Sequence, residues 1–253
     1  TMITWPRGHK LIYLTEYYLL TGDAAVLPAI EAYAVNFAKN QSLFGTVGHK
    51  YADKNLDGSA NGPMGGVYGV VNSAGMPYFL GILLAKECEA ANPGSMATES
   101  VTVIDAAIER SSRFFASYTG KGAIPYGEGV PYHQLHETNG KSGLAALSFA
   151  LQPNRGDEGN FYSKMATASA DEREIGHTGS FFNYLWAPLG AAMGGEEAAA
   201  AHFSGISWML DLNRNWDGGF DYDCLNGEGP KDGSEYNDFR MSTAALLTYA
   251  LPL

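Results

Sequence analysis

Residues 126–139 hold the densest group of side chains that can do chemistry. The segment reads YGEGVPYHQLHETN and brings two His, two Glu and two Tyr together directly before an apolar stretch. A His exchanges a proton near neutral pH, and apolar surroundings can raise the pKa of a Glu into the same range. We therefore predict that Glu137 and His136 are catalytic. The other members of the group are predicted to bind substrate: Glu128, Tyr132 and His133.

The same residues have a structural explanation, which stays open at this point. A polar side chain just before a helix can cap the first N–H groups of that helix, as Glu137 and Asn139 would do here. The His side chains would then hydrogen-bond to loop carbonyls and take no part in a reaction.

Two later segments supply further candidates. The sequence HTGS at 177–180 heads an aromatic stretch, where the positive end of a helix dipole favours a neutral imidazole. The sequence WDGGFDYDC at 216–224 offers carboxylates and a thiol, which becomes a nucleophile only beside a base. These segments give the remaining predicted catalytic residues: His177, Asp217, Asp221 and Cys224. Further predicted substrate-binding residues are His9, Tyr184, Trp186 and Arg240. The alternatives are an ordinary cap at Thr178 or Ser180, and an Asp217 side chain bonded within its own turn.

Residues 53–59, DKNLDGS, have the first half of a calcium-loop pattern. Asp53, Asn55 and Asp57 place oxygen atoms at positions 1, 3 and 5, and a Gly at position 6 allows the sharp turn. The bidentate Glu expected at position 12 is absent, since Met64 stands there. Calcium is therefore a candidate cofactor, and an Asx turn without an ion is the alternative.

Composition excludes several classes of protein. An apolar fraction of 45% with 17% charged residues is not typical of a disordered chain. No apolar run reaches the ~20 residues of a membrane span. A net charge of −11 repels phosphate backbones and anionic lipid, so we expect neither nucleic acid nor a membrane as a partner. The nucleophile elbow, the P-loop, the HExxH motif and the dinucleotide fingerprint are all absent from the sequence.

The spacing of apolar residues predicts helices, because positions i, i+3, i+4 and i+7 recur and no segment alternates with period 2. The expected helices cover residues 11–20, 27–38, 76–91, 98–118, 142–151, 161–170, 181–193, 196–212 and 239–251. Strongly apolar helices follow small-residue turns, and they alternate with more amphipathic ones. Helices that are apolar all round belong inside a fold, and one-faced helices belong outside. The pattern predicts an all-α fold in which inner and outer helices form a partial α/α toroid.

The turn at 216–220, WDGGF, resembles the Asp-Gly-Gly-aromatic turns of terpenoid-cyclase-like and prenyltransferase-like toroids. Residues 177–251 are similar to an uncharacterised bacterial domain family assigned to that superfamily, and the similarity extends from Trp5 to the C-terminus. The resemblance implies an α/α toroid, an architecture also found among glycosidases, and implies no established activity.

The first four residues, TMIT, resemble the start of the β-galactosidase α-peptide of cloning vectors. We therefore expect residues 1–4 to be a vector-derived leader and residues 5–253 to be one toroid domain. Nine helices are too few for a full ring of six hairpins, which favours either an N-terminally truncated fragment or a ring completed in a homo-oligomer. The localisation stays open.

Three functions compete. The first is a hydrolase acting on a carbohydrate, with Glu137 as the acid, Asp217 or Asp221 as the base, and His136 and His177 orienting the substrate. The second is a hydrolase of phosphate, sulfate or carboxylic esters that uses a His, a metal or Cys224. The third is a ring without catalysis that binds glycans or acts as a scaffold. Because His and Glu accompany the aromatic residues in the same loops, we favour an enzyme acting on a small-molecule or glycan substrate.

Overall fold

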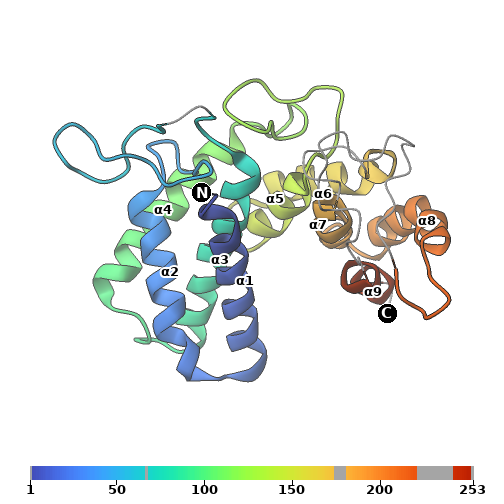
Figure 1. Ribbon diagram of the computed structural model, residues 1–253, viewed down its shortest axis with the longest axis horizontal. Helices are drawn as coiled ribbons and strands as arrows, with labels where there is room; N and C mark the ends of the chain where they lie inside the picture. The colour runs from blue at the N-terminus through green and yellow to red at the C-terminus, as the bar shows by residue number, and fades with distance from the viewer. Residues whose placement is uncertain (1, 66–67, 174–180, 221–241, 252–253) are drawn as a thin grey trace. The chain divides into compact units, whose positions relative to one another are not determined.

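The computed structural model describes residues 2–65, 68–173, 181–220 and 242–251. Within these ranges the chain forms nine α-helices and two short 3₁₀ helices, with no strand, so the predicted all-α class is confirmed (Figure 1). The chain divides into two compact units, one of Thr1–Tyr118 with Pro125–Val130 and one of Thr119–Ile124 with Pro131–Leu253. Each unit is described by itself below, and the expectation of a single domain stays a prediction.

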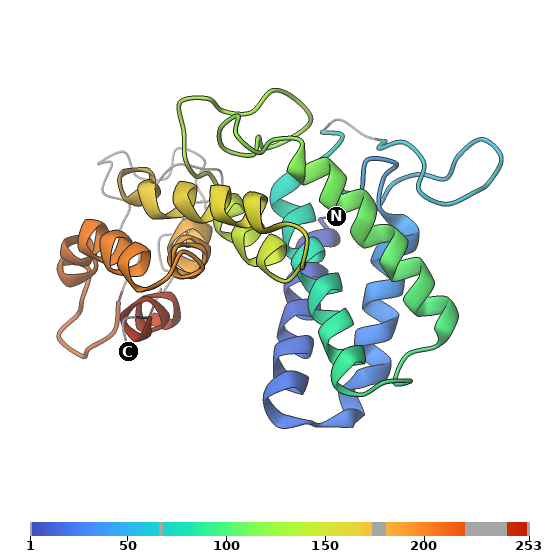
Figure 2. The same cartoon turned by 180° about the vertical axis from the view of Figure 1, so that it is seen from behind.

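The first unit contains four long helices: α1 (Thr4–Thr21), α2 (Leu27–Asn40), α3 (Asn72–Ala91) and α4 (Thr98–Ala116), with the 3₁₀ helix η1 (Ala24–Val26) between α1 and α2. They lie side by side, and alternate helices are in contact, α1 with α3 and α2 with α4 (Figures 1 and 2). Helix α3 is buried on nearly all sides up to Ala85. Helix α4 buries one face, with Ile104, Ala107, Ser111 and Phe115 at helical spacing. The difference agrees with the predicted contrast between apolar and amphipathic helices.

The second unit contains α5 (Lys141–Ala150), α6 (Gly156–Ala168), the 3₁₀ helix η2 (Ser169–Glu172), α7 (Phe181–Ala192), α8 (Glu196–Leu212) and α9 (Ser242–Ala250). Alternate helices again touch, since α5 contacts α7, α7 contacts α9 and α6 contacts α8. One apolar cluster of this unit joins α7, α8 and α9 through Tyr184, Ile206, Met209 and Ala245.

Helices α5 and α7 approach each other closely because both carry glycine at the crossing. A Cβ atom added to Gly143 would lie 2.1 Å from the carbonyl oxygen of Trp186. A Cβ atom added to Gly190 would lie 2.5 Å from the Cα atom of Gly143. The backbones therefore touch directly, which fixes the start of α5 against α7.

Three helices, α1, α3 and α6, begin at least four residues earlier than the periodicity predicts, and long-range contacts hold the starts of α1 and α3. Helix α1 begins at Thr4. Thr4 is fully buried, and its hydroxyl donates to the carbonyl of Gly48 at 2.6 Å, so the expectation of a leader outside the fold at residues 1–4 is not confirmed. Helix α3 begins at Asn72, whose side-chain amide donates to the carbonyls of Pro125 and Gly127. Both starts depend on contacts between residues far apart in the sequence, which local periodicity does not report.

Candidate functional site

The start of α5 is capped by Glu137 from the preceding loop. Its carboxylate accepts the backbone N–H groups of Thr138 at 2.7 Å, Ser142 at 3.0 Å and Gly143 at 2.8 Å. Gly140 stands before the helix at φ 70° and offers no side chain for a cap, so Glu137 satisfies N–H groups that would otherwise lack acceptors. The side chain of Glu137 is fully buried. The contacts are those of the capping alternative, and a catalytic role for Glu137 stays a prediction.

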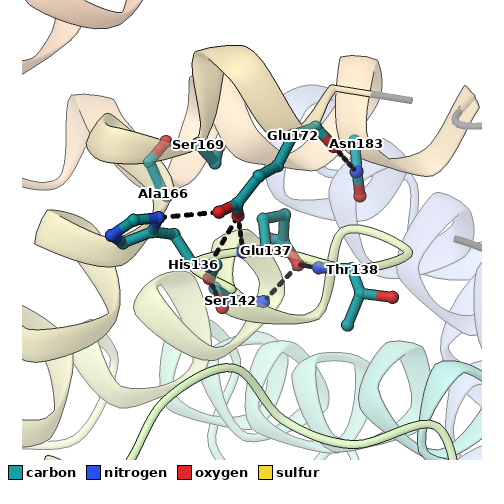
Figure 3. A network of polar contacts seen from close by, with 8 residues as sticks. All are labelled: His136, Glu137, Thr138, Ser142, Ala166, Ser169, Glu172 and Asn183. Carbon is teal, nitrogen blue, oxygen red and sulfur yellow. Dashed lines mark hydrogen bonds and ion pairs between the residues drawn. The ribbon is translucent and has the colours of Figure 1, made fainter. Parts of the chain in front are cut away.

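Glu172, at the end of η2, holds the loop that carries Glu137 and was not among the predicted site residues. One oxygen, Oε2, accepts the backbone N–H of His136 at 2.5 Å and that of Glu137 at 2.7 Å. The other oxygen, Oε1, lies 2.8 Å from Nδ1 of His136 (Figure 3). The Glu172 side chain is only 11% exposed, so this carboxylate replaces its lost hydration with three hydrogen bonds.

His136 is the exposed member of this network, with 47% of its side chain accessible. The carboxylate of Glu172 accepts a hydrogen bond only, so Nδ1 of His136 carries the proton that is shared with it. In the neutral ring, Nε2 then has the lone pair, on the side of the ring away from Glu172 (Figure 3). Among the described residues, none hydrogen-bonds to Nε2. A His held by a carboxylate at one nitrogen and free at the other has the arrangement of a general base.

Asn183, on α7, links the loop before α5 to the end of η2 by two buried hydrogen bonds. It is buried, its Oδ1 accepts the N–H of Gly140 at 2.5 Å, and its Nδ2 donates to the carbonyl of Glu172 at 2.9 Å. Ser142 adds a bond from its hydroxyl to the carbonyl of His136 at 2.7 Å. The position of His136 is therefore set by α5, η2 and α7 together.

Lys141, the first residue of α5, is fully buried beside Glu137. Its Nζ atom has no hydrogen-bond partner among the residues that the structure describes. Burial lowers the pKa of Lys141, and the charge of Glu137 opposes that shift. Burial likewise raises the pKa of Glu137. The backbone N–H groups and the charge of Lys141 favour the ionised form and lower this pKa, but burial has the larger effect. The two groups form a buried acid–base pair next to the exposed imidazole.

The other predicted residues of the second unit do not join this network through any described contact. His133 is exposed, and its Nδ1 lies 2.7 Å from the carbonyl of Lys121. Tyr132 is 38% exposed. Asp217 accepts the N–H of Gly219 within its own turn, as its structural alternative predicts. Tyr184 and Trp186 are buried in α7.

Two predicted residues belong to the first unit. His9 lies on α1 with its Nδ1 3.1 Å from the carbonyl of Trp5, and burial lowers its pKa. Glu128 is exposed. The remaining predictions lie outside the described residues: His177, Asp221, Cys224 and Arg240.

The predicted calcium loop is held by hydrogen bonds of its own. Asp57 accepts both the N–H and the hydroxyl of Ser59, at 2.9 and 2.6 Å, and these bonds lower the pKa of Asp57. The Asn55 side-chain amide donates to the Ser59 hydroxyl and to the Ala60 carbonyl. Within the described part of the chain, no group of three or more His, Cys, Asp or Glu could hold a metal ion. The contacts are those of an Asx turn, and bound calcium stays a prediction.

The described helices bear on the expectation that a membrane is not a partner. None of them is both long and apolar enough to cross a membrane. A small-molecule or glycan substrate and a homo-oligomer stay predictions.

The comparisons with known proteins give a family for the whole chain. No curated protein and no solved structure matches this sequence. The sequence model of DUF6288, described as a domain of unknown function, matches residues 1–253. The chain therefore belongs to the DUF6288 family.

Proposed function

We propose that this chain is a hydrolase in which His136, oriented by Glu172, acts as the general base. The observation that carries the proposal is the 2.8 Å contact between Nδ1 of His136 and Oε1 of Glu172. A buried carboxylate here holds a half-exposed imidazole, so one ring nitrogen is fixed by the protein and the other can meet a substrate.

The proposed step is ordinary base catalysis of hydrolysis. Nε2 of His136 takes a proton from a water molecule as the water oxygen attacks the carbonyl carbon, phosphorus or sulfur of an ester. The bond to the leaving oxygen then breaks, and the imidazolium returns the proton to that oxygen. The Glu172 carboxylate stabilises the imidazolium and keeps the ring in the productive tautomer without taking up the proton itself.

The substrate class follows from the groups that are accessible. Glycoside hydrolysis usually needs two carboxyl groups that flank the bond, ~5–5.5 Å apart for retention or ~6.5–9.5 Å apart for inversion. The Glu137 carboxylate is fully buried and already accepts three backbone N–H groups. A single exposed imidazole with a carboxylate behind it fits the hydrolysis of an ester better, whether carboxylic, phosphate or sulfate.

A hydrolase acting on a carbohydrate is the second candidate, because the same unit exposes large aromatic faces. Trp208 is 48% exposed and Trp216 is 99% exposed. Sugar rings stack on such faces, and the exposed carboxylate of Asp217 follows Trp216 directly. The contact of alternate helices within each unit supports the partial α/α toroid as the architecture that would hold either activity.

The test is a panel of chromogenic carboxylic esters, phosphate and sulfate esters and glycosides, assayed with the full chain and two variants. His136→Gln removes the base, while Gln134→Ala removes another exposed side chain of the same loop and is the matched control. We expect ester turnover in the wild type, a loss of about 10²–10⁴-fold in kcat for His136→Gln, and a nearly unchanged rate for Gln134→Ala. Equal rates for all three proteins would reject His136 as the base. Turnover of glycosides alone would favour the second candidate, and no turnover at all would favour a glycan-binding or scaffold ring.

A further inference from the structure

A small cavity lies inside the second unit, between the end of η2, α7 and α8, and apolar atoms make up most of its wall. Its lining includes Arg173, Asn183, Tyr184 and His202. The space is large enough for about one water-sized particle. The cavity is separate from His136, which does not line it.

Two of the lining residues each have a buried polar side-chain atom with no partner among the described residues. His202 is only 3% exposed, and its Nδ1 makes no hydrogen bond. The carbonyls of Thr167 and Ala166 lie at its ring, so Nε2 is the nitrogen that donates to them. The Nε atom of Arg173 is also buried and unpartnered. Buried polar atoms in native proteins are satisfied in the great majority of cases, so the pair indicates a bound species.

The charges around the cavity favour an anion. Helix α8 is packed against α6, η2, α7 and α9. Of the titratable side chains on these elements and on the turn after η2, only Arg173 and Tyr184 line the cavity with His202. No carboxylate does, because the side chain of the adjacent Glu172 bonds to His136 instead. The guanidinium of Arg173 lies over the ring of Trp208 at 4.9 Å and donates to the Ala170 carbonyl, and no described carboxylate forms an ion pair with it.

We propose that this cavity binds one small monovalent anion of the halide class, held by the Nε–H of Arg173 and the protonated Nδ1 of His202. Chloride is a small single-atom anion that is somewhat larger than water, so the lining has to widen slightly to admit it. The proposal does not depend on the proposed hydrolase activity.

Binding is linked to protonation of His202. When Nε2 donates to the backbone, a neutral His202 presents a lone pair at Nδ1, which repels an anion. Uptake of a proton converts that atom to a second donor. Burial lowers the pKa of His202, and a bound anion raises it again, so affinity is highest at acid pH and falls as pH rises.

The test measures thermal unfolding of the full chain in sodium chloride and in sodium methanesulfonate at equal ionic strength, at pH 5.5 and pH 8. We expect chloride to raise Tm by about 2–4 °C at pH 5.5 and by less at pH 8. Arg173→Met and His202→Gln each remove one donor and should abolish the difference between the two salts. The matched control His133→Gln removes an exposed His and should keep it. Equal Tm values in the two salts at both pH values would overturn the proposal.

A second measurement uses only the wild-type chain, so it still tests the proposal if a variant fails to fold. Crystals of the wild-type chain grown in sodium bromide at pH 5.5 should show anomalous scattering between Arg173 and His202. A water molecule in that place, with no anomalous signal, would contradict the anion site.

Discussion

The Glu172 carboxylate contacts the His136 ring at Nδ1 at 2.8 Å and also accepts the backbone N–H of the same residue. Both contacts act on one residue, so Glu172 fixes the backbone position of His136 and the orientation of its ring together. The imidazole is thereby held in place by the protein alone, so the proposed reaction would not have to create this order.

The first prediction is that Glu172→Gln lowers both activity and stability. The amide has one acceptor oxygen where the carboxylate has two, so at least one N–H donor of His136 or Glu137 loses its partner. We expect a loss of about 1–3 kcal/mol in the free energy of unfolding, measured by urea denaturation. In the ester assay kcat should fall and KM should change little, because the tautomer and the imidazolium are no longer stabilised. Asp171→Asn, at the exposed neighbouring position, is the control; an equal loss in that variant would contradict the assignment.

The second prediction concerns Asn183, which positions Glu172 through its backbone carbonyl. Asn183→Ala leaves the N–H of Gly140 and the carbonyl of Glu172 without their partner in the interior. We expect a loss of about 1–3 kcal/mol in the free energy of unfolding, because buried polar groups lose their partner. We also expect a changed pH profile of kcat, because Glu172 is then held less firmly against His136. Asn154→Ala, at an exposed position, should alter neither. A stability loss with an unchanged pH profile would show a structural role alone.

The third prediction tests the contact between α5 and α7. Gly143→Ala would place a Cβ atom 2.1 Å from the Trp186 carbonyl oxygen, which is backbone and cannot rotate away. The helices must separate, and we expect a loss of about 1–3 kcal/mol in the free energy of unfolding. Gly156→Ala is the matched control, because an added Cβ meets nothing within 4 Å at the start of α6. It should leave stability unchanged or increase it, since Ala favours a helix more than Gly does. Equal effects of the two substitutions would argue against the close crossing.

Local pattern predicts the helices better than it predicts the site. The predicted range 196–212 coincides with α8, and 27–38 falls two residues short of the end of α2. These helices have apolar residues at helical spacing, which is a property of neighbours in sequence. Glu172 is 36 residues from His136, and nothing in the sequence between them predicts that they meet. Glu137 is predicted as a site residue because it precedes an apolar helix. The same position allows it to cap that helix. The residue types that suggest catalysis therefore could not by themselves distinguish the exposed His136, the proposed base, from the buried Glu137, which caps the helix.

The fourth prediction is an energetic coupling between Glu137 and Lys141. Glu137→Gln alone takes the partner of Lys141 away and turns an amide group toward backbone N–H donors. We expect a loss of about 1–3 kcal/mol in the free energy of unfolding, because a buried N–H group loses its acceptor. Lys141→Met keeps the volume and removes the charge, so the double variant should lose at least about 1 kcal/mol less than the sum of the two single variants. Simple additivity of the two losses would show that the groups do not interact.

The fifth prediction is a dip in stability near neutral pH that comes from the same pair. Burial raises the pKa of Glu137 from its ordinary 4.5, so as pH rises above 4.5 the unfolded chain releases this proton while the folded chain keeps it. The free energy of unfolding then falls with rising pH. Burial lowers the pKa of Lys141 from its ordinary 10.5, so as pH falls below 10.5 the unfolded chain binds a proton that the folded chain does not. That contribution to stability therefore falls with decreasing pH.

Between pH 4.5 and pH 10.5 the two effects together give a minimum in the free energy of unfolding. Each group changes that free energy by at most about 1.4 kcal/mol per pH unit. The measurement is urea denaturation from pH 4.5 to pH 10 for the wild type and for the Glu137→Gln/Lys141→Met double variant, in which neither group can titrate. Subtracting the two curves removes the contribution of every other ionisable group that the substitutions leave unaltered. The free energy of unfolding of the wild type minus that of the double variant should be smallest near neutral pH if the cost of burying the two charges exceeds their mutual attraction. A maximum there would instead mean that Glu137 and Lys141 form a fully ionised pair whose mutual attraction, with the backbone N–H groups at the start of α5, exceeds the cost of burying both charges.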